Sequence, residues 1–171
     1  MAYKSLILEK EGPVAIITLN RPNAGNSFDF NMMVEFDDVI KRVGGDPDVR
    51  AVIITGTGKH FSTGIDLSMF TDAEGLVEKE GTSTDVTPDL DDQTYGRGTI
   101  IGAVIRIRDM KKPVIAAING TAAGAAFSMT LCCDMRIASD KARFSMLFVK
   151  RGIAPDTGGS FTLSRIVGFP K

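Results

Sequence analysis

The chain has 171 residues, of which 43% are hydrophobic and 24% are charged, a composition typical of globular proteins. Twenty basic and 21 acidic residues give a net charge of -1, and no cluster of Lys or Arg is long enough to follow a phosphate backbone, so nucleic acid is excluded as a partner. Charged residues break the apolar runs well before the ~20 positions that a bilayer-spanning helix needs, which excludes membrane insertion.

The first predicted elements are two strands, residues 5–9 and 13–19, which are short β-branched runs with a Gly in the turn between them. This pattern favours a hairpin of paired strands. After the strand-breaking residues 20–23, apolar residues recur at helical spacing from Asp29 and predict a helix that ends near Gly44 and Gly45. Its apolar positions are Met32, Met33, Phe36, Val39, Ile40 and Val43.

Two continuous apolar runs further along, residues 51–55 and 114–118, are typical of strands that are covered on both faces. Between them, apolar residues from Ile100 onward predict a helix that ends before Lys111. A third apolar helix, roughly residues 126–133, leads to a short strand at 135–138. This alternation of strands and helices predicts an α/β architecture.

Residues 71–98 interrupt the alternation. They hold eight acidic and two basic residues and almost no apolar periodicity, so we predict a long mobile loop. Loops of this length are often lids or binding segments, and a plain solvated acidic excursion is the alternative.

The start of the chain and its cysteines both favour the cytoplasm. The first four residues lead directly into a strand pattern, without the basic stretch and apolar core of a secretory signal. Cys132 and Cys133 are adjacent in an apolar stretch, so we expect buried thiols in a reducing compartment rather than a disulfide framework.

Two glycine-containing turns, HFSTGIDL at 60–67 and NGTAAGAAFSM at 119–129, each follow a buried strand and lie beside the start of a helix. Small residues let the backbone approach a ligand closely. If the turns converge, the N–H groups of Ile65 and Ala125 can both point at one carbonyl oxygen, supported by the positive end of the following helix. Loss of one such donor costs on the order of a hundredfold to a thousandfold in rate where negative charge develops. Each turn alone also fits an ordinary structural turn.

Five motifs in this order resemble the crotonase family, which includes enoyl-CoA hydratases and isomerases. They are NRP at 20–22, HFSTGIDL, KPVIAAINGTAAG at 112–124, CDMRIAS at 133–139 and RGIAPDTGGSFTLSRIVG at 151–168. The resemblance spans nearly the whole chain and implies one α/β domain over residues 1–171, a crotonase (ClpP-like) fold of repeated ββα units in two roughly perpendicular sheets. It also implies homotrimers or homohexamers. Family members usually continue past the position of Lys171 into helices that close the acyl pocket, so we expect an exposed apolar patch where those helices are lacking.

The resemblance also implies the site residues. The two oxyanion-hole amides fall on Ile65 and on Ala125, a position where the family commonly has Gly. Coenzyme A would lie against two turns, mainly through backbone contacts, and since it is part of the substrate we expect no separate cofactor. These turns supply Ala24, Gly25, Asn26, Ser62, Gly64, Asp66 and Leu67. No cluster of His, Cys or carboxylate residues has metal-ligand spacing, so we expect no metal.

The reaction is suggested by three further positions. The two Glu residues with which family hydratases deliver water fall on Ser128 and Phe148, neither of which can do acid-base work, and Phe148 is expected to contact substrate. Asp156 lies where several crotonase isomerases and a dehalogenase place a functional Asp, but the single histidine, His60, does not match what the dehalogenases need. One carboxylate can remove a proton beside a thioester carbonyl and return it to another carbon. Alternatively, Asp156 caps the helix that follows it.

The sequence therefore predicts an enzyme that stabilises an acyl-CoA enolate and isomerises the double bond of an enoyl-CoA, with Asp156 as the base. Two alternatives stay open. One is a hydratase that activates water through Asp156, and the other is a non-catalytic acyl-CoA-binding or assembly subunit, suggested by the missing Glu pair and by the position at which the chain stops.

Overall fold

The computed structural model describes residues 3–71 and 100–168, and residues 72–98 of the predicted mobile loop lie outside this part. The chain begins with the expected antiparallel hairpin, β1 (Leu6–Glu11) and β2 (Val14–Leu19). Gly12 in the turn has a φ of 57°, a left-handed conformation that glycine adopts at little cost. The hairpin prediction is confirmed, with the first strand two residues longer at its end than expected.

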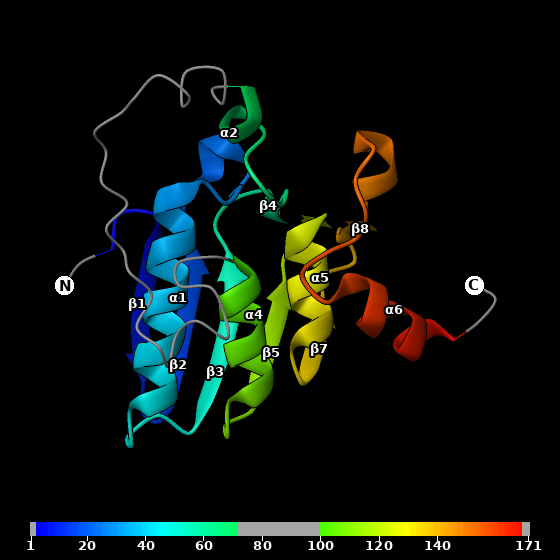
Figure 1. The fold of residues 1–171 in the computed structure, drawn as a ribbon. Helices are drawn as coiled ribbons and strands as arrows, with labels where there is room; N and C mark the ends of the chain where they lie inside the picture. Colours follow the sequence, from blue (N-terminus) through cyan, green and yellow to red (C-terminus); the bar gives the residue numbers. More distant parts are fainter. Residues whose placement is uncertain (1–2, 72–99, 169–171) are drawn as a thin grey trace, which may run out of the picture.

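The larger sheet has five strands in the order β1-β2-β3-β5-β7 (Figure 1). All of its pairings beyond the first hairpin are parallel, and they add β3 (Ala51–Gly56), β5 (Val114–Ile118) and β7 (Met135–Ala138). Parallel neighbours need crossover connections, which is why strands and helices alternate along the sequence. The α/β prediction is confirmed.

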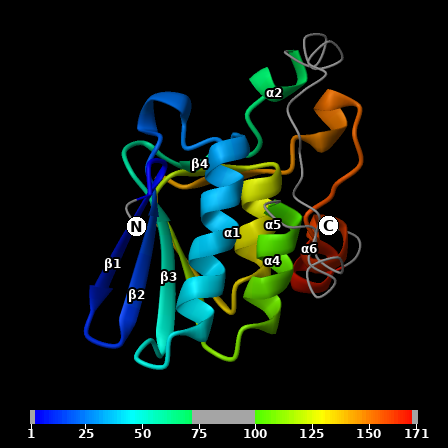
Figure 2. The ribbon, with the colours of Figure 1, turned by 60° about the vertical axis from the view of Figure 1, so that its left-hand side comes forward.

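Three helices cover one face of this sheet, as the two ribbon views show (Figures 1 and 2). They are α1 (Phe30–Gly45), α4 (Ile100–Asp109) and α5 (Ala125–Cys132). Helix α1 is capped by Asp29, whose side chain accepts a hydrogen bond of 2.8 Å from Met32 N. Most of the periodic apolar side chains of α1 and α4 are buried in the predicted core, whereas Met33 is partly buried and Ile101 is exposed.

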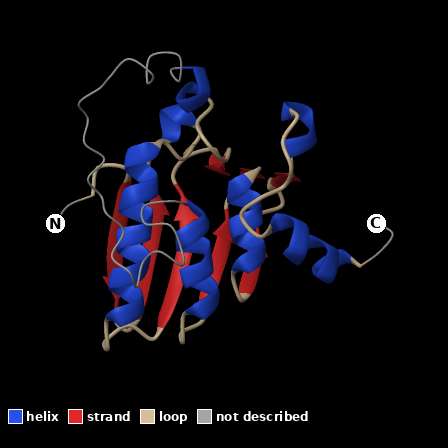
Figure 3. Ribbon diagram, in the orientation of Figure 1, coloured by secondary structure: helices blue, strands red, loops and turns tan. Residues whose placement is uncertain are grey.

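A second sheet of three short parallel strands lies at one end of the larger sheet, and its strands run across it (Figure 3). Its order is β4-β6-β8, formed by β4 (His60–Ser62), β6 (Thr121–Ala123) and β8 (Arg143–Ser145). Strands β4 and β6 lie within the segments 60–67 and 119–129, which were predicted to be glycine turns. The second sheet is the element that brings these turns together.

Four short elements complete the described part. They are η1 (Pro22–Ala24), α2 (Ser68–Thr71), η3 (Phe148–Arg151) and α6 (Gly159–Val167). Helix α6 packs on α5 but leaves Phe161, Ile166 and Val167 exposed. In residues 3–71 and 100–168, we find no helix with the length and apolar character required to traverse a bilayer.

Candidate active site

The two glycine turns converge because the strands before them are neighbours. Strand β4 pairs with β6 in parallel, with His60 opposite Thr121, so both turns leave the same edge of the smaller sheet. The contact is close, since a β-carbon built on Gly64 would lie 2.7 Å from the carbonyl oxygen of Ala123 and 3.5 Å from the amide nitrogen of Ala125.

Both turns have backbone conformations that favour glycine. Gly64 has a φ of 94°, and Gly124, the residue before α5, has a φ of 54° and a ψ of -129°. The Gly124 N–H donates to Ser145 O at 2.9 Å, which ties the second turn to β8. The two glycines therefore set the path of the backbone directly before Ile65 and Ala125.

The backbone on either side of Ile65 is held by Phe28, with which Ile65 forms a parallel bridge. Phe28 N donates to Gly64 O at 2.8 Å, and Asp66 N donates to Phe28 O at 3.0 Å. The N–H of Ile65 itself, and that of Ala125 at the first position of α5, donate to no atom in the described part of the chain. Two main-chain donors are thus left open where the two turns meet.

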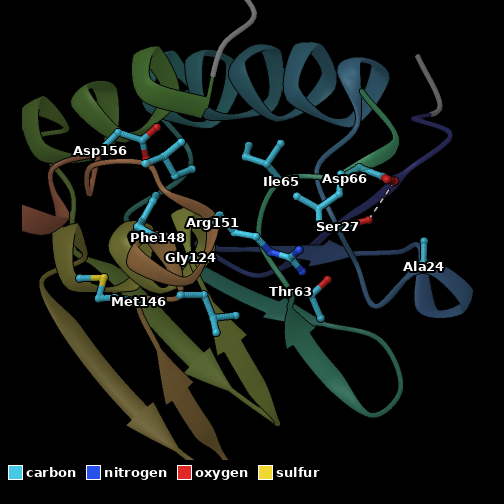
Figure 4. A pocket seen from close by; sticks show the side chains of 13 residues that line it. Ala24, Ser27, Thr63, Ile65, Asp66, Gly124, Met146, Phe148, Arg151 and Asp156 are labelled. Carbon is cyan, nitrogen blue, oxygen red and sulfur yellow. Dashed lines mark hydrogen bonds between the residues drawn. The ribbon is translucent and has the colours of Figure 1, made fainter. Parts of the chain in front are cut away.

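A cavity of about 440 Å³ opens beside this meeting point (Figure 4). Apolar side chains form much of its wall, and among the described residues Asp66, Arg151 and Asp156 are the charged ones that line it. In the described part of the chain, the lining is Ala24, Ser27, Thr63, Ile65, Asp66, Leu67, Gly124, Met146, Leu147, Phe148, Arg151, Ile153 and Asp156. Of the residues predicted from the sequence, the cavity brings together Ala24, Ile65, Asp66, Leu67, Phe148 and Asp156, with Ala125 next to the lining residue Gly124.

The other predicted residues lie behind the wall of the cavity. Asn26 is fully buried, and its side-chain amide donates to Thr57 O at 2.9 Å and to His60 O at 2.8 Å. Gly25 O accepts from Thr63 N at 3.0 Å. Ser62 is also fully buried, and its hydroxyl accepts from Gly64 N at 3.2 Å. Gly25 and Asn26 therefore tie residues 24–26 to the segment 57–63, and Ser62 braces the turn before Ile65 from within.

Asp66 lines the cavity with a carboxylate that is already hydrogen-bonded on both oxygens. One oxygen accepts from the Ser27 hydroxyl at 3.0 Å and from Arg21 at 3.2 Å, and the other accepts from the Ser68 hydroxyl at 2.9 Å and its amide at 3.2 Å. The Ser68 side chain contributes most to lowering the pKa of Asp66, against the opposing effect of burial. A carboxylate so fully occupied serves as a brace of the turn that carries Ile65.

Asp156 has an exposed carboxylate that accepts from the Thr157 hydroxyl at 2.7 Å. The residue that precedes the first turn of α6 is Gly158, and no side chain caps that helix. The alternative in which the Asp156 side chain caps α6 is therefore wrong, because the two residues after it form a turn in which Gly159 N donates to Asp156 main-chain O at 2.8 Å. The carboxylate is left at the cavity.

Comparison with known proteins agrees with this arrangement. The family model described as "Enoyl-CoA hydratase/isomerase" matches residues 9–171. The chain belongs to the enoyl-CoA hydratase/isomerase (crotonase) family.

Individual members of the family are similar over nearly the whole chain. A short-chain-enoyl-CoA hydratase of Clostridium acetobutylicum is 40% identical over 171 residues, and a crotonyl-CoA hydratase of Syntrophomonas wolfei is 37% identical over 170, each alignment covering 98% of this chain. The crystal structure of an enoyl-CoA hydratase from Polaromonas sp. JS666 superposes with a TM-score of 0.77 at 31% identity and covers 97% of the chain. The chain spans 59% of the length of each of these three proteins. The predicted crotonase fold is confirmed.

The two positions that match the Glu pair of the crotonase hydratases lie in different surroundings. Ser128, in the middle of α5, is fully buried, and a β-carbon built on Gly159 would lie 2.4 Å from its hydroxyl oxygen. The hydroxyl is 3.8 Å from the sulfur of Met146, its hydrogen-bond acceptor. Phe148 is 5% exposed and lines the cavity, which is consistent with the predicted substrate contact.

Seven residues of the cavity wall were not among the predicted site residues: Ser27, Thr63, Gly124, Met146, Leu147, Arg151 and Ile153. Four of them come from the connection between β8 and α6, which has no periodic pattern. Leu147 in this connection has a φ of 53°, a left-handed conformation that is uncommon for residues other than glycine. Nothing in the local sequence predicts this conformation, so the sequence does not place this connection beside the cavity.

The two cysteines play no part in the cavity. Both are buried, as predicted, and burial raises the pKa of each thiol, that of Cys133 to about 12. In the two described ranges, no group of three His, Cys, Asp or Glu residues is placed to hold a metal ion.

Proposed function

We propose that this protein moves the double bond of an enoyl-CoA, with the amides of Ile65 and Ala125 as the oxyanion hole and Asp156 as the base. The observation that carries the proposal is a shared cavity. Ile65, Gly124 and Asp156 come from three separate segments and line the same space of about 440 Å³. A single carboxylate beside two open amides is the minimum that such a proton transfer requires.

The two amides act on the thioester carbonyl oxygen. Removal of a proton from the carbon beside this carbonyl places negative charge on its oxygen, where fixed N–H donors stabilise the enolate. The donor at Ala125 has the added effect of the N-terminus of α5. Because the donors belong to turns that are braced by Phe28 and Ser145, they need little reorganisation as the charge develops.

Asp156 supplies the proton transfers. Its carboxylate takes the proton as the C–H bond breaks, the electron pair moves into the enolate, and the same proton is returned to the carbon two positions further along, where a new C–H bond forms. No water, metal or redox partner enters this balance. The Thr157 hydroxyl, 2.7 Å from the carboxylate, orients the base.

The lining of the cavity suggests how the substrate lies. The turns at Ala24 and Thr63 would hold the coenzyme A part, and the apolar group of Leu147, Phe148 and Ile153 would take the acyl chain. Coenzyme A enters with the substrate, so no separate cofactor is proposed. We further propose a cytoplasmic homotrimer or homohexamer formed from one domain, supported by the exposed apolar side chains of α6.

A hydratase is the second candidate, and it is favoured by the names of the most similar relatives in the comparison, a crotonyl-CoA hydratase and a short-chain-enoyl-CoA hydratase. In this version Asp156 activates a water molecule for addition to the double bond. Ser128 and Phe148 offer no second acid-base group.

The test is to supply purified protein with a 3-enoyl-CoA and with crotonyl-CoA and to measure double-bond migration and water addition separately. Asp156→Asn should lower isomerisation by ~10²–10⁴-fold, the usual contribution of a general base. Unchanged isomerisation in this variant would remove the role of Asp156.

A matched control is Asp48→Asn, which neutralises another exposed aspartate, in the connection between α1 and β3 and outside the lining of the cavity, and should leave both rates unchanged. Calorimetry with acetyl-CoA completes the experiment. Binding without turnover on either substrate would point to the non-catalytic acyl-CoA-binding subunit, whereas water addition that depends on Asp156 would point to the hydratase.

A further inference from the structure

The guanidinium group of Arg21 lies between two carboxylates that come from different parts of the chain. One of its terminal nitrogens is 3.1 Å from Asp29 Oδ2 and the other is 3.2 Å from Asp66 Oδ2. All three side chains are between 20% and 27% exposed. The group joins the cap of α1 to the turn that carries Ile65.

Ser27 connects the same guanidinium to the backbone bridge beside the cavity. Arg21 donates to Ser27 main-chain O at 2.5 Å, and the Ser27 hydroxyl donates to Asp66 Oδ2 at 3.0 Å, the bond drawn beside Ile65 in Figure 4. Ser27 is directly followed by Phe28, whose two hydrogen bonds flank Ile65. Arg21 is therefore linked to both residues of the Phe28–Ile65 bridge. It bonds to Ser27, which precedes Phe28, and to Asp66, which follows Ile65.

We propose that Arg21 is a positioning residue for the Ile65 amide, acting through Asp66 and Ser27. The inference rests on the proposed function, because it assigns a task to Arg21 only if the Ile65 N–H polarises a thioester carbonyl. An arginine suits the task, since its planar fork can hold two carboxylates and a carbonyl in fixed directions at once.

The charge of Arg21 has a second effect on the same atoms. Asp66 follows Ile65 directly, so its negative charge lies close to the oxygen on which an enolate would develop, and like charges repel at this range. Arg21 compensates one of the two charges of Asp29 and Asp66. Without it, the pair would carry two uncompensated negative charges beside the oxyanion hole.

The experiment compares Arg21→Met and Arg21→Gln with wild type in two measurements. The first is the rate of isomerisation of a 3-enoyl-CoA, where we expect kcat to fall ~10–100-fold with KM within ~3-fold, because the lost interaction acts mainly in the transition state. The second is the infrared carbonyl band of bound ¹³C-acetyl-CoA, which needs no turnover. The oxyanion hole should shift this band to lower frequency in wild type, and both variants should reverse part of the shift.

Two further variants separate positioning from general stability. Arg21→Lys keeps the charge but not the fork, so it should recover part of kcat and part of the band shift. Arg106→Met is the matched control, because Arg106 has a similar exposure of 18% and forms a 2.8 Å ion pair with the buried Asp37, between α1 and α4 and away from the cavity. It should lower stability and leave kcat and the band unchanged.

Wild-type kcat in folded Arg21→Gln, together with a carbonyl band at the wild-type frequency, would overturn the inference while leaving the proposed function intact. A loss of stability or a rise in KM alone would overturn it as well, since a purely structural role predicts that result. If wild type shows neither isomerisation nor a band shift, the proposed function fails, and the inference fails with it.

Discussion

Gly64 lies directly against the main chain of Ala123, so closely that a β-carbon on Gly64 would be 2.7 Å from the Ala123 carbonyl oxygen. Real β-carbons do not approach a backbone atom to this distance. The contact brings together two turns that are about 60 residues apart in sequence, directly before Ile65 and Ala125.

Gly64→Ala is therefore expected to separate the two turns. The new methyl group would meet backbone on one side and would also force alanine into a φ of 94°, so we predict a loss of ~1–3 kcal/mol in the free energy of unfolding. Isomerisation should fall at least ~100-fold because the two donors no longer converge. Gly45→Ala is the control, since nothing lies within 4 Å of a β-carbon there, and its stability should be unchanged or slightly higher.

Asp156→Asn should leave stability almost unchanged. The carboxylate is exposed and caps no helix, and it accepts a hydrogen bond from the Thr157 hydroxyl, which can also donate to an amide oxygen. We expect the free energy of unfolding, measured by urea denaturation, to change by less than ~0.5 kcal/mol. A loss of more than ~1 kcal/mol, typical of a removed helix cap, would restore the structural interpretation of this residue.

Ser128 has no room for the glutamate that family hydratases carry. Its side chain is fully buried beneath Gly159, so Ser128→Glu would place an unpaired carboxylate and three more heavy atoms in a filled space. We predict that the free energy of unfolding, measured by thermal denaturation, falls by more than ~3 kcal/mol. Ser128→Ala should cost less than ~1 kcal/mol, because the hydroxyl has only a thioether sulfur at 3.8 Å as acceptor. Native-like stability of Ser128→Glu would show that the space can open.

The cysteines should be inert in the native protein. Burial raises the pKa of both thiols, and the thiolate is the reactive form, so at pH 8 neither Cys132 nor Cys133 should react rapidly with an aromatic disulfide reagent. In urea both should react at once. Fast labelling of folded protein, with an unchanged circular dichroism spectrum, would contradict the buried placement.

Stability should decline at alkaline pH. Burial raises the pKa of Cys133 from 9.0 to about 12, and burial together with the hydrogen bond to Asp38 raises that of Tyr3 from 10.0 to about 12. Groups with raised pKa values in the folded state contribute stability that is complete below their unfolded pKa and is lost as pH rises through the folded one. Urea unfolding between pH 9 and 12 should show this decline. Tyr3→Phe should flatten its upper part, from pH 10, and a slope identical to wild type would exclude Tyr3 as a source.

The long elements could be predicted from the sequence because their burial repeats along the chain. Helix α1 shows a helical repeat of apolar positions, and β3 and β5 are continuous apolar runs. Each pattern extends over five residues or more, which is long enough to be recognised. The strands β4, β6 and β8 have three residues each, too few to show a period, and within residues 3–71 and 100–168 they pair with one another and with no other strand. Their positions could not be read locally.

The site was predictable where it depends on backbone and on recognisable motifs, and less so where it depends on distant side-chain partners. The glycine patterns predicted turns before Ile65 and Ala125, but the convergence of these turns was a condition of the hypothesis, and it depends on the pairing of β4 with β6. The saturation of Asp66 did not, because Arg21 lies 45 positions away in the sequence. The cap at Asp156 was a reasonable local pattern, but a turn at Thr157, with a φ of 53°, moves the helix start beyond its reach.

The open N–H groups at Ile65 and Ala125 belong to the main chain, and every amino acid except proline would present the same hydrogen in their place. In the proposed function, exchange of either side chain would therefore leave both donors in place. The capacity to polarise a carbonyl would then depend on the path of the chain, and new chemistry could arise by altering one surrounding group at a time.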